Sequence, residues 1–353
     1  MGYKTTVTPA DITTCLKNKA HELGFQLAAC CPAVTPTGLH HLTDWLSEGY
    51  AGTMQYIQDR REAYAHPHHV LENVQSLLVL AMHYGEGDVV TPTAGQGRVA
   101  RYAWGSTDYH DLIHKRIKQL KQYHQEILPT EQCRGVVDTA PILEREFAQM
   151  AGIGWVGKNT MLIHSQQGSY FFLTILLSTA ELDYDQPSKT DHCGTCTACL
   201  DQCPTNAFPA PYVLDATKCI SYLTIEHRGS IPDTLKQNMG DWVFGCDICQ
   251  DVCPWNRRGP NPSEPDFVAT ERLNCLNIKQ LFQSNEDSFR AVYRQTPLWR
   301  TKRDGLLRNA AIALGNQLAV EHLDILKDAL QVESAIVQDA CRWAISKIES
   351  ANT

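Results

Sequence analysis

The sequence predicts an α+β protein built in three parts, and three patterns lead to this prediction. Near the N-terminus, apolar runs with strand character, such as residues 76–82 and 170–177, alternate with amphipathic helical segments. The middle is rich in cysteine and has few long apolar runs, which is typical where metal organises the chain. The remainder has helical periodicity to its end. We therefore expect an α/β domain over residues 1–180, a cysteine-rich domain over 181–262 and an α-helical domain over 263–353.

Helices and strands alternate in the expected N-terminal domain. We expect helices over residues 11–23, 111–128 and 141–151, and strands over 76–82, 135–138 and 170–177. The second of these strands ends at an acidic residue, Asp138. The glycine-rich stretch GIGWVGK follows a helix rather than a strand, so it does not match the pattern for binding a nicotinamide dinucleotide.

The composition is that of a soluble globular protein. The chain has 353 residues, of which 43% are apolar and 20% charged, and a formal net charge of −8. Any contact with nucleic acid must therefore come from a local basic patch. Residues 1–16 contain no export signal and no apolar run is long enough to span a membrane, so we expect a cytoplasmic protein. Fourteen cysteines in such a chain favour metal ligation over disulfides.

The strongest signal is a run of four cysteines with the spacing C-x2-C-x2-C-x3-C-P, which is the spacing of bacterial ferredoxins. A second block, C-x2-C-x3-C-P, lacks its first cysteine nearby, and an upstream cysteine is the natural substitute. In the ferredoxin arrangement the last cysteine of a block binds the other cluster. We therefore expect two [4Fe–4S] clusters, the first held by Cys193, Cys196, Cys199 and Cys253 and the second by Cys203, Cys219, Cys246 and Cys249.

Zinc binding by CxxC pairs is the alternative for these eight residues. Two blocks that end in Cys-Pro fit zinc poorly, whereas eight ligands divide evenly between two cubanes. The other six cysteines are expected to be core or surface thiols. Because iron–sulfur clusters pass electrons one at a time, a further centre must carry out the substrate chemistry, and an organic or corrinoid cofactor is the usual solution.

Five motifs follow one another along the chain: VVDTAPILEREFAQMAGIGWVGKNTMLI, CGTCTACLDQCPTNAF, KCISYLTIEHRGSIP, GCDICQDVCPWN and LLRNAAIALGN. Together they resemble the epoxyqueuosine reductase family, from about residue 9 to the end. The resemblance implies an oxidoreductase that reduces epoxyqueuosine to queuosine at the wobble position of tRNA, the last step of queuosine biosynthesis. It implies cobalamin beside the two clusters, a cobalamin-binding core like that of reductive dehalogenases, and a ferredoxin-like middle domain.

Asp138, in VVDTAP, matches the position of the catalytic proton donor of that family. Removal of an epoxide oxygen requires a proton, and a carboxylic acid with a raised pKa in a partly desolvated pocket could donate it. The alternative, from the residues alone, is that Asp138 caps the helix that begins near Pro141.

The resemblance also implies further cofactor-binding residues. Together with Asp138, these are Arg60, Ala100, Lys158, Ser221, Asp247 and Gln250. Polar residues beside cluster cysteines can instead hydrogen-bond the sulfur atoms and tune their potential, which is the alternative for the last three. The alternative for Lys158 is an ordinary exposed lysine. The chain has no DxHxxG motif to supply an axial histidine to cobalt, and this agrees with the family.

Two segments of the helical tail, LRNAAIALGN over 307–316 and VQDACRWAISKI over 337–348, share the pattern of HEAT-type helices. Basic residues gather at the first of them. The residues expected to bind tRNA are Arg228, Arg300, Lys302, Arg303 and Arg308. The alternative for this basic cluster is a solvated helix face. We expect the target base to be splayed from its neighbours into a pocket.

Two other functions stay open at this point. One is a corrinoid-dependent reductive dehalogenase of a small molecule, against which the missing export signal and the basic tail count. The other is a ferredoxin-like electron carrier without a substrate, which would not need the large N-terminal domain. The expected partners are tRNA that carries epoxyqueuosine and an external electron donor of flavodoxin or ferredoxin type. We expect a monomer that does not bind membranes.

Overall fold

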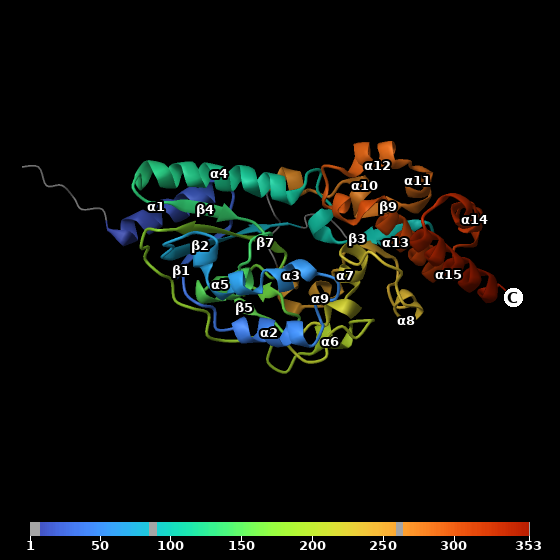
Figure 1. The fold of residues 1–353 in the computed structure, drawn as a ribbon, viewed down its shortest axis with the longest axis horizontal. Helices are drawn as coiled ribbons and strands as arrows, with labels where there is room; N and C mark the ends of the chain where they lie inside the picture. The colour runs from blue at the N-terminus through green and yellow to red at the C-terminus, as the bar shows by residue number, and fades with distance from the viewer. Residues whose placement is uncertain (1–7, 85–89, 259–263, 353) are drawn as a thin grey trace, which may run out of the picture.

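The computed structural model describes residues 8–84, 90–258 and 264–352. Its N-terminal part is built around an antiparallel sheet with the strand order β1-β2-β7-β4. These strands are β1 (Leu27–Pro32), β2 (Ser76–His83), β7 (Phe171–Ser178) and β4 (Cys133–Val136). Figure 1 shows helices α1 (Pro9–Glu22) and α4 (Tyr109–Ile127) along one side of this sheet. The predicted mixture of helices and sheet is confirmed.

Strand β2 is buried along its whole length, which explains its unbroken apolar sequence. Leu78 and Leu80 belong to the core that contains α1 and α4, whereas Leu77 and Val79 belong to the core that contains α5 (Glu144–Met150). Because successive side chains of a strand point to opposite faces, one strand serves both cores.

A second sheet joins three distant parts of the chain. Strand β3 (Gln96–Val99) pairs in parallel with β8 (Trp242–Phe244) and antiparallel with β9 (Cys275–Asn277). Val99, Ala100 and other residues near β3 therefore share a core with the cysteine-rich part and the C-terminal helices, although they fall within the expected first domain. The expected domain boundaries remain predictions.

Short elements carry the cysteine-rich part and the segments that pack on it. They are α2 (Leu39–Ser47), α3 (Gln55–Asp59), the hairpin of β5 (Trp155–Val156) and β6 (Leu162–Ile163), α6 (Ala198–Asp201), α7 (Ile220–Ile225), α8 (Asp233–Lys236) and α9 (Ile248–Asp251). The indole of Trp45 donates to the carbonyl of Leu214 at 2.6 Å, and the carbonyl of Tyr50 accepts from the amide of Ala216 at 3.0 Å. These bonds tie the connection between α2 and α3 to the cysteine-rich part.

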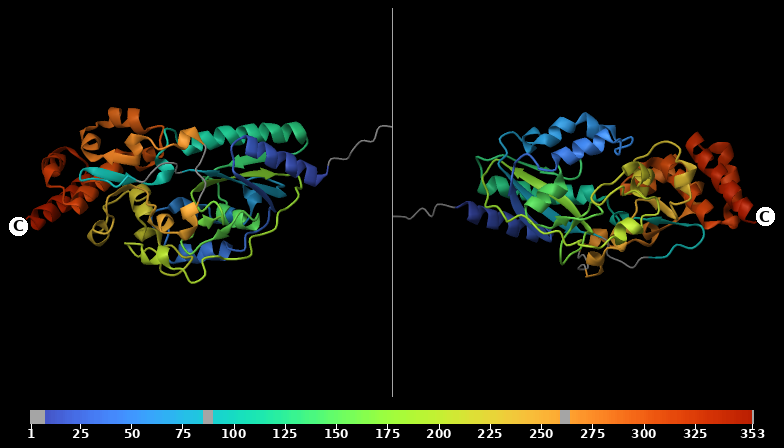
Figure 2. Two further views of the ribbon diagram at one scale, coloured as in Figure 1. Left: turned by 180° about the vertical axis from the view of Figure 1, so that it is seen from behind. Right: turned by 90° about the horizontal axis from the view of Figure 1, so that it is seen from below.

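The C-terminal helices form the end of the molecule opposite α1 (Figure 2). They are α10 (Glu271–Asn274), α11 (Ile278–Gln283), α12 (Glu286–Tyr293), α13 (Lys302–Gln317), α14 (Leu323–Val332) and α15 (Ala335–Ala351). The two similar sequence segments lie in α13 and α15, which pack against each other. A HEAT-like repeat remains a prediction for this region. No helix in the described part of the chain is long and apolar enough to cross a membrane.

Candidate redox site

The cysteine side chains of the two blocks gather in two groups of four. Burial and the neighbouring thiols of Cys193, Cys253 and Cys196 raise the pKa of Cys199 to about 11. Thiols can act on one another in this way only when they lie close together. The four residues expected at the first cluster therefore lie near one another, in the loop before α6, in α6 itself and just after α9.

The second group forms around Cys249 in α9. Burial and then the thiol of Cys219 raise the pKa of Cys249 well above its usual value, with smaller effects from Cys199 and Cys203. Burial, Cys219 and Cys249 do the same for Cys246. The effect of Cys199 on Cys249 shows that the two groups are neighbours, which is the arrangement that electron transfer between two cubanes needs.

The donor set fits iron–sulfur clusters. All eight cysteines are free thiols, and the members of the second group are more deeply enclosed than Cys196, which is exposed. No three His, Cys, Asp or Glu side chains in the described ranges form a site for a single metal ion. In a cubane, by contrast, each of the four thiolates binds a different iron atom.

Lys158 lies against the first cysteine group, and its predicted role at the corrinoid stays a prediction. Its ammonium group donates to the carbonyls of Gly194 at 2.6 Å and Cys196 at 3.0 Å, which fixes the loop that carries two of the cysteines. The buried indole N–H of Trp155 makes no hydrogen bond in the described part of the chain, but it lies near Cys193 and lowers the pKa of that thiol against the effect of burial.

Two residues expected at the corrinoid, Ala100 and Asp247, lie beside the second group. Ala100 is buried, and its amide donates to the carbonyl of Phe244 at 2.8 Å. Gly245 has a φ of +68°, and a Cβ atom there would come within 2.5 Å of the Ala100 side chain, so only glycine fits. Asp247 is buried, and its carboxylate accepts from the amide of Arg101 at 2.7 Å.

Gln250 and Ser221 are held by the protein. The amide of the buried Gln250 donates to the carbonyl and the hydroxyl of Ser169, both at 3.0 Å. The backbone N–H of Ser221 hydrogen-bonds the sulfur of Cys219 and lowers the pKa of that thiol against the effect of burial. The roles of Gln250 and Ser221, at the corrinoid or on the cluster sulfur atoms, stay predictions.

Asp138 lies at the centre of a second, polar site just after β4. Its backbone is left-handed, with a φ of +57°, a conformation that costs about 1–2 kcal/mol in a residue with a side chain. The Tyr109 hydroxyl donates to its carboxylate at 3.0 Å, and Nε2 of His110 lies 3.4 Å from the same oxygen. The Asp138 side chain is 52% exposed, so a substrate can reach it. The structure does not support the alternative of a helix cap, because α5 begins at Glu144, after Leu143 and without a side-chain cap.

The charge state of this site differs from the one expected. The hydrogen bond with His110 lowers the pKa of Asp138, so the expected raised pKa of this carboxyl group was wrong. Raised pKa values are found instead for two neighbouring residues, Glu144 and His110. Burial, and then the charge of Asp138, raise the pKa of Glu144 to about 8. Although burial opposes it, hydrogen bonds with Asp108 and Asp138 raise the pKa of His110 to about 9.

Two arginines approach this acid site from other elements. The guanidinium of Arg60 donates to the carbonyl of Thr139 at 2.9 Å, so it fixes the loop after Asp138. Arg300 pairs with Glu226 at 2.8 Å, and its charge also lowers the pKa of Asp138. The sequence reasoning missed Tyr109, His110 and Glu144. The one available signal was that Tyr109 and His110 stand directly before the predicted helix over residues 111–128, which precedes the strand that ends at Asp138.

The structure contradicts part of the predicted tRNA-binding set. Arg308 is 0% exposed and donates to the carbonyls of Leu223, His227 and Gly229 at 2.6–2.8 Å. Arg303 makes a two-pronged ion pair with Glu333, with both contacts at 2.7 Å. The prediction was wrong for these two residues, because their guanidinium groups hold the fold together.

The other three basic residues lie nearer the surface. Arg228 donates to the carbonyls of Arg300 at 2.9 Å and Thr301 at 3.1 Å, so its guanidinium supports the segment that carries Arg300. Arg300 has a side chain that is 43% exposed. Lys302 is exposed, and its ammonium group lies 4.2 Å from the centre of the Trp299 ring. Of the five predicted residues, Arg228, Arg300 and Lys302 are exposed.

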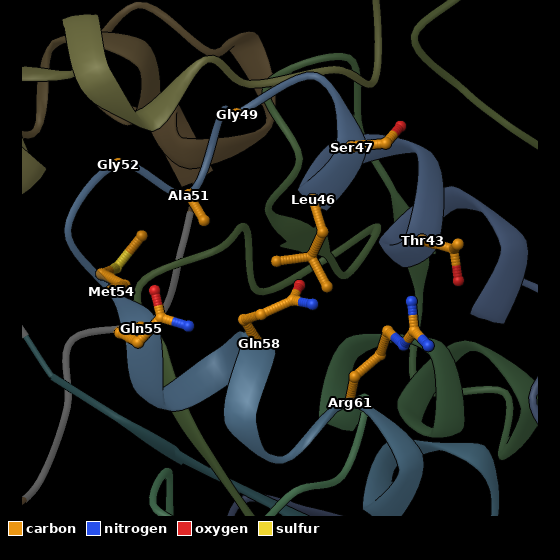
Figure 3. Close-up of a pocket in the computed structure, with 10 residues that line it drawn as sticks. All are labelled: Thr43, Leu46, Ser47, Gly49, Ala51, Gly52, Met54, Gln55, Gln58 and Arg61. Carbon is orange, nitrogen blue, oxygen red and sulfur yellow. The ribbon is translucent and has the colours of Figure 1, made fainter.

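A cavity of about 410 Å³ lies between α2 and α3, on the segment that leads to Arg60 (Figure 3). Its wall combines hydroxyl and amide groups with apolar side chains, and Arg61 is its one charged residue. None of the predicted site residues lines it. It is therefore separate from the group formed by Asp138, Tyr109 and His110.

Comparisons with known proteins identify the family that this chain resembles. A family model described as "4Fe-4S double cluster binding domain" matches residues 192–256, and one described as "Epoxyqueuosine reductase QueG, DUF1730" matches residues 65–139. The chain is 39% identical to the epoxyqueuosine reductase of Pseudomonas aeruginosa over 344 residues, which cover 96% of this chain and 95% of the relative. It is 36% identical to that of Escherichia coli K12 over 342 residues, covering 96% and 90%.

Solved structures of epoxyqueuosine reductases also match this chain over almost its whole length. The crystal structure of an epoxyqueuosine reductase with an epoxyqueuosine-modified tRNA-Tyr stem loop matches with a TM-score of 0.91 at 27% identity, covering 97% of this chain and 91% of that chain. The structure of epoxyqueuosine reductase from Streptococcus thermophilus matches with a TM-score of 0.88 at 26% identity, covering 96% and 91%.

Proposed function

This chain belongs to the epoxyqueuosine reductase family, and from that premise we propose that it reduces epoxyqueuosine to queuosine at the wobble position of tRNA. The reaction uses cobalamin and two [4Fe–4S] clusters. The relatives align over almost their whole length, and one structural neighbour binds a tRNA stem loop that carries the substrate nucleoside. The chain is an oxidoreductase of tRNA modification.

The observation that carries this proposal is the contact between the acid site and the second cysteine group. Tyr102 packs edge-on against Tyr109, with ring centres 6.0 Å apart, and Tyr109 hydrogen-bonds Asp138. On its other side, Tyr102 lies 5.9 Å from the ring of Phe244, two residues before Cys246. The acid group and the second cluster thus lie near one another, as they must if one cofactor is to receive electrons on one side and face the substrate on the other.

The two cysteine groups would place one cluster near the surface and one deeper in the protein. The group of Cys193, Cys196, Cys199 and Cys253 would hold the outer cluster, because Cys196 is exposed and an external donor can approach it. The group of Cys203, Cys219, Cys246 and Cys249 would hold the inner one. Clusters in these positions would pass single electrons inward from a donor of flavodoxin or ferredoxin type.

The residues beside the inner cluster would face the corrinoid. The Arg101 amide, next to Ala100 in the chain, donates to Asp247, and Ser221 lies on α7. When bound, cobalamin supplies the strongly reducing electrons that open the epoxide. The protein excludes water on this side, since Ala100 and Asp247 are both buried.

Asp138 and its neighbours would act on the substrate oxygen. The half-exposed carboxyl group is held in place by the Tyr109 hydroxyl and is turned outward by its left-handed backbone. It can therefore transfer a proton to the oxygen that leaves the epoxide carbon. Arg300 lies on the same side and can balance a phosphate of the nucleotide that enters the site.

The C-terminal helices would bind the rest of the tRNA. Arg300 and Lys302 are exposed cations at the start of α13, and each can contact a backbone phosphate of the anticodon stem. A HEAT-like arrangement of these helices, a cytoplasmic location and a monomeric state complete the proposal.

Anaerobic reconstitution tests the function. The protein is loaded with iron and sulfide, supplied with cobalamin and a low-potential reductant, and given tRNA that carries epoxyqueuosine. We expect two clusters for each chain by iron and sulfide analysis, and queuosine in the digested tRNA by mass spectrometry only when cobalamin is present. Protein that carries both clusters and cobalamin but forms no queuosine would refute the proposal. A small halogenated phenol in place of tRNA tests the dehalogenase alternative.

A further inference from the structure

The proposed reaction consumes more protons than one carboxyl group can carry. When an epoxide becomes an alkene, both carbon–oxygen bonds break, a carbon–carbon double bond forms and the oxygen leaves as water. The change takes up two electrons, which the redox cofactors supply, and two protons. Asp138 holds at most one proton, and its lowered pKa leaves it ionised before the substrate arrives. The protons must therefore reach Asp138 from another group.

The first turn of α4 places His110 beside Asp138. Asp108 is the N-cap residue of this helix, and its carboxylate accepts from the backbone N–H of His110 at 3.0 Å. The same oxygen lies 2.8 Å from Nδ1 of the His110 ring. Because Nδ1 is bound to Asp108, Nε2 points to the carboxylate of Asp138, 3.4 Å away.

Aromatic packing fixes the plane of this imidazole ring. Tyr109 stacks on His110 with ring centres 4.0 Å apart, and its other face stacks on Phe172 at the same spacing. Phe172 belongs to β7 at the centre of the sheet, so the ring is attached to a rigid part of the fold. The His110 side chain is 23% exposed, which allows it to recover a proton from water between transfers.

The charged groups around His110 come from several elements. Asp108 lies at the start of α4, and Asp138 and Glu144 lie between β4 and the first turn of α5. Arg300, next to α13, acts on both Asp108 and Asp138. The carboxyl groups outnumber the cation, so the positive form of the imidazole is favoured, in agreement with the pKa of about 9.

We infer that Asp108, His110 and Asp138 form a proton relay that delivers both protons to the departing oxygen, an inference that rests on the proposed function. A proton moves from Nε2 of His110 to Oδ2 of Asp138, and the carboxyl group passes it to the oxygen. His110 is then recharged by water and repeats the transfer. Asp108 is a positioning residue that keeps the imidazole in line.

The His110→Gln variant tests the relay. Glutamine keeps a polar side chain of similar size but cannot carry the proton. We expect kcat on epoxyqueuosine-tRNA at pH 7 to fall about 100-fold, with an unchanged KM and unchanged iron and cobalt contents. Added imidazole should restore part of the activity. His114→Gln, one turn further along α4 and exposed, is the matched control and should keep the wild-type kcat.

The pH profile separates proton transfer from a merely structural role. Wild-type kcat should fall as the pH rises above about 9, because His110 then loses its proton. Asp108→Asn should move this limb to lower pH, and in the substrate-free protein the ring signals of His110 should shift in the same direction by NMR. A His110→Gln enzyme with wild-type kcat, or a loss that imidazole does not repair, would overturn the relay. Wild-type enzyme that forms no queuosine would instead overturn the proposed function.

Discussion

The Arg308→Met substitution should destabilise the protein and leave the affinity for tRNA unchanged in the folded enzyme. Arg308 is completely buried in α13. Its guanidinium donates hydrogen bonds to the carbonyls of Leu223, His227 and Gly229 and to the side chain of Asn309. Methionine fills a similar volume but donates to none of them. Each buried acceptor left without a partner costs roughly 1–3 kcal/mol.

The net cost is smaller than the sum of these losses. Burial lowers the pKa of Arg308 to about 10, which shows that the buried charge has a desolvation cost in the native protein. Removing the charge removes this cost and offsets part of the lost hydrogen-bond energy. We expect a loss of about 3–5 kcal/mol, which is the usual range for removing one partner of a buried charged network. At roughly 2–4 °C per kcal/mol, the thermal midpoint should fall by about 6–20 °C.

Two measurements check this prediction. Circular dichroism of anaerobically prepared protein gives the thermal midpoint, and a titration with tRNA well below that temperature gives the affinity at several salt concentrations. Arg308→Lys, which keeps the charge but supplies fewer donors, should show an intermediate midpoint. A methionine variant of wild-type stability that bound tRNA more weakly would refute the reasoning and would return Arg308 to the tRNA-binding surface.

Three further predictions concern the site. Asp138→Asn should lower turnover at least about 100-fold while iron, sulfide and cobalt contents stay at wild-type values, and an enzyme that keeps its rate would remove this carboxyl group from the mechanism. Cys249→Ser should lose about half of the iron and sulfide by chemical analysis, whereas Cys275→Ser should lose none; equal contents would disprove the ligand set. Lys302→Ala should reduce the salt dependence of tRNA binding by about one phosphate contact, while Arg303→Ala should lower the thermal midpoint instead. An unchanged salt slope for the lysine variant would rule out a phosphate contact there.

The cysteine pattern shows what local sequence can predict. Cys193, Cys196 and Cys199 lie within seven positions of one another, so the chain has few ways to arrange them other than around one centre. The same holds for the buried strands: the apolar run over residues 76–82 lies in β2, and the run over 170–177 overlaps β7 in all but its first residue. In each case the information lies within a few consecutive residues.

The basic residues show what local sequence cannot predict. The cluster from Arg300 to Arg308 is continuous in sequence, yet Arg308 is buried by carbonyls some eighty residues away and Arg303 is paired with Glu333 thirty residues away. Whether an arginine faces water or the core depends on which distant segments pack over it, and no feature of its own neighbourhood records that.

The sequence by itself predicted the two sets of cluster ligands and the main strands, because short-range spacing and apolar runs encode these features, and the family resemblance pointed to Asp138. Only the tertiary structure decided the charge state of the acid site. Tyr109 and His110 come from α4, Glu144 from α5 and Arg300 from the C-terminal part, and they meet at Asp138 through folding alone. The pKa of a carboxyl group depends on the charges, hydrogen bonds and burial around it in space, and these are set by contacts between residues far apart in the chain.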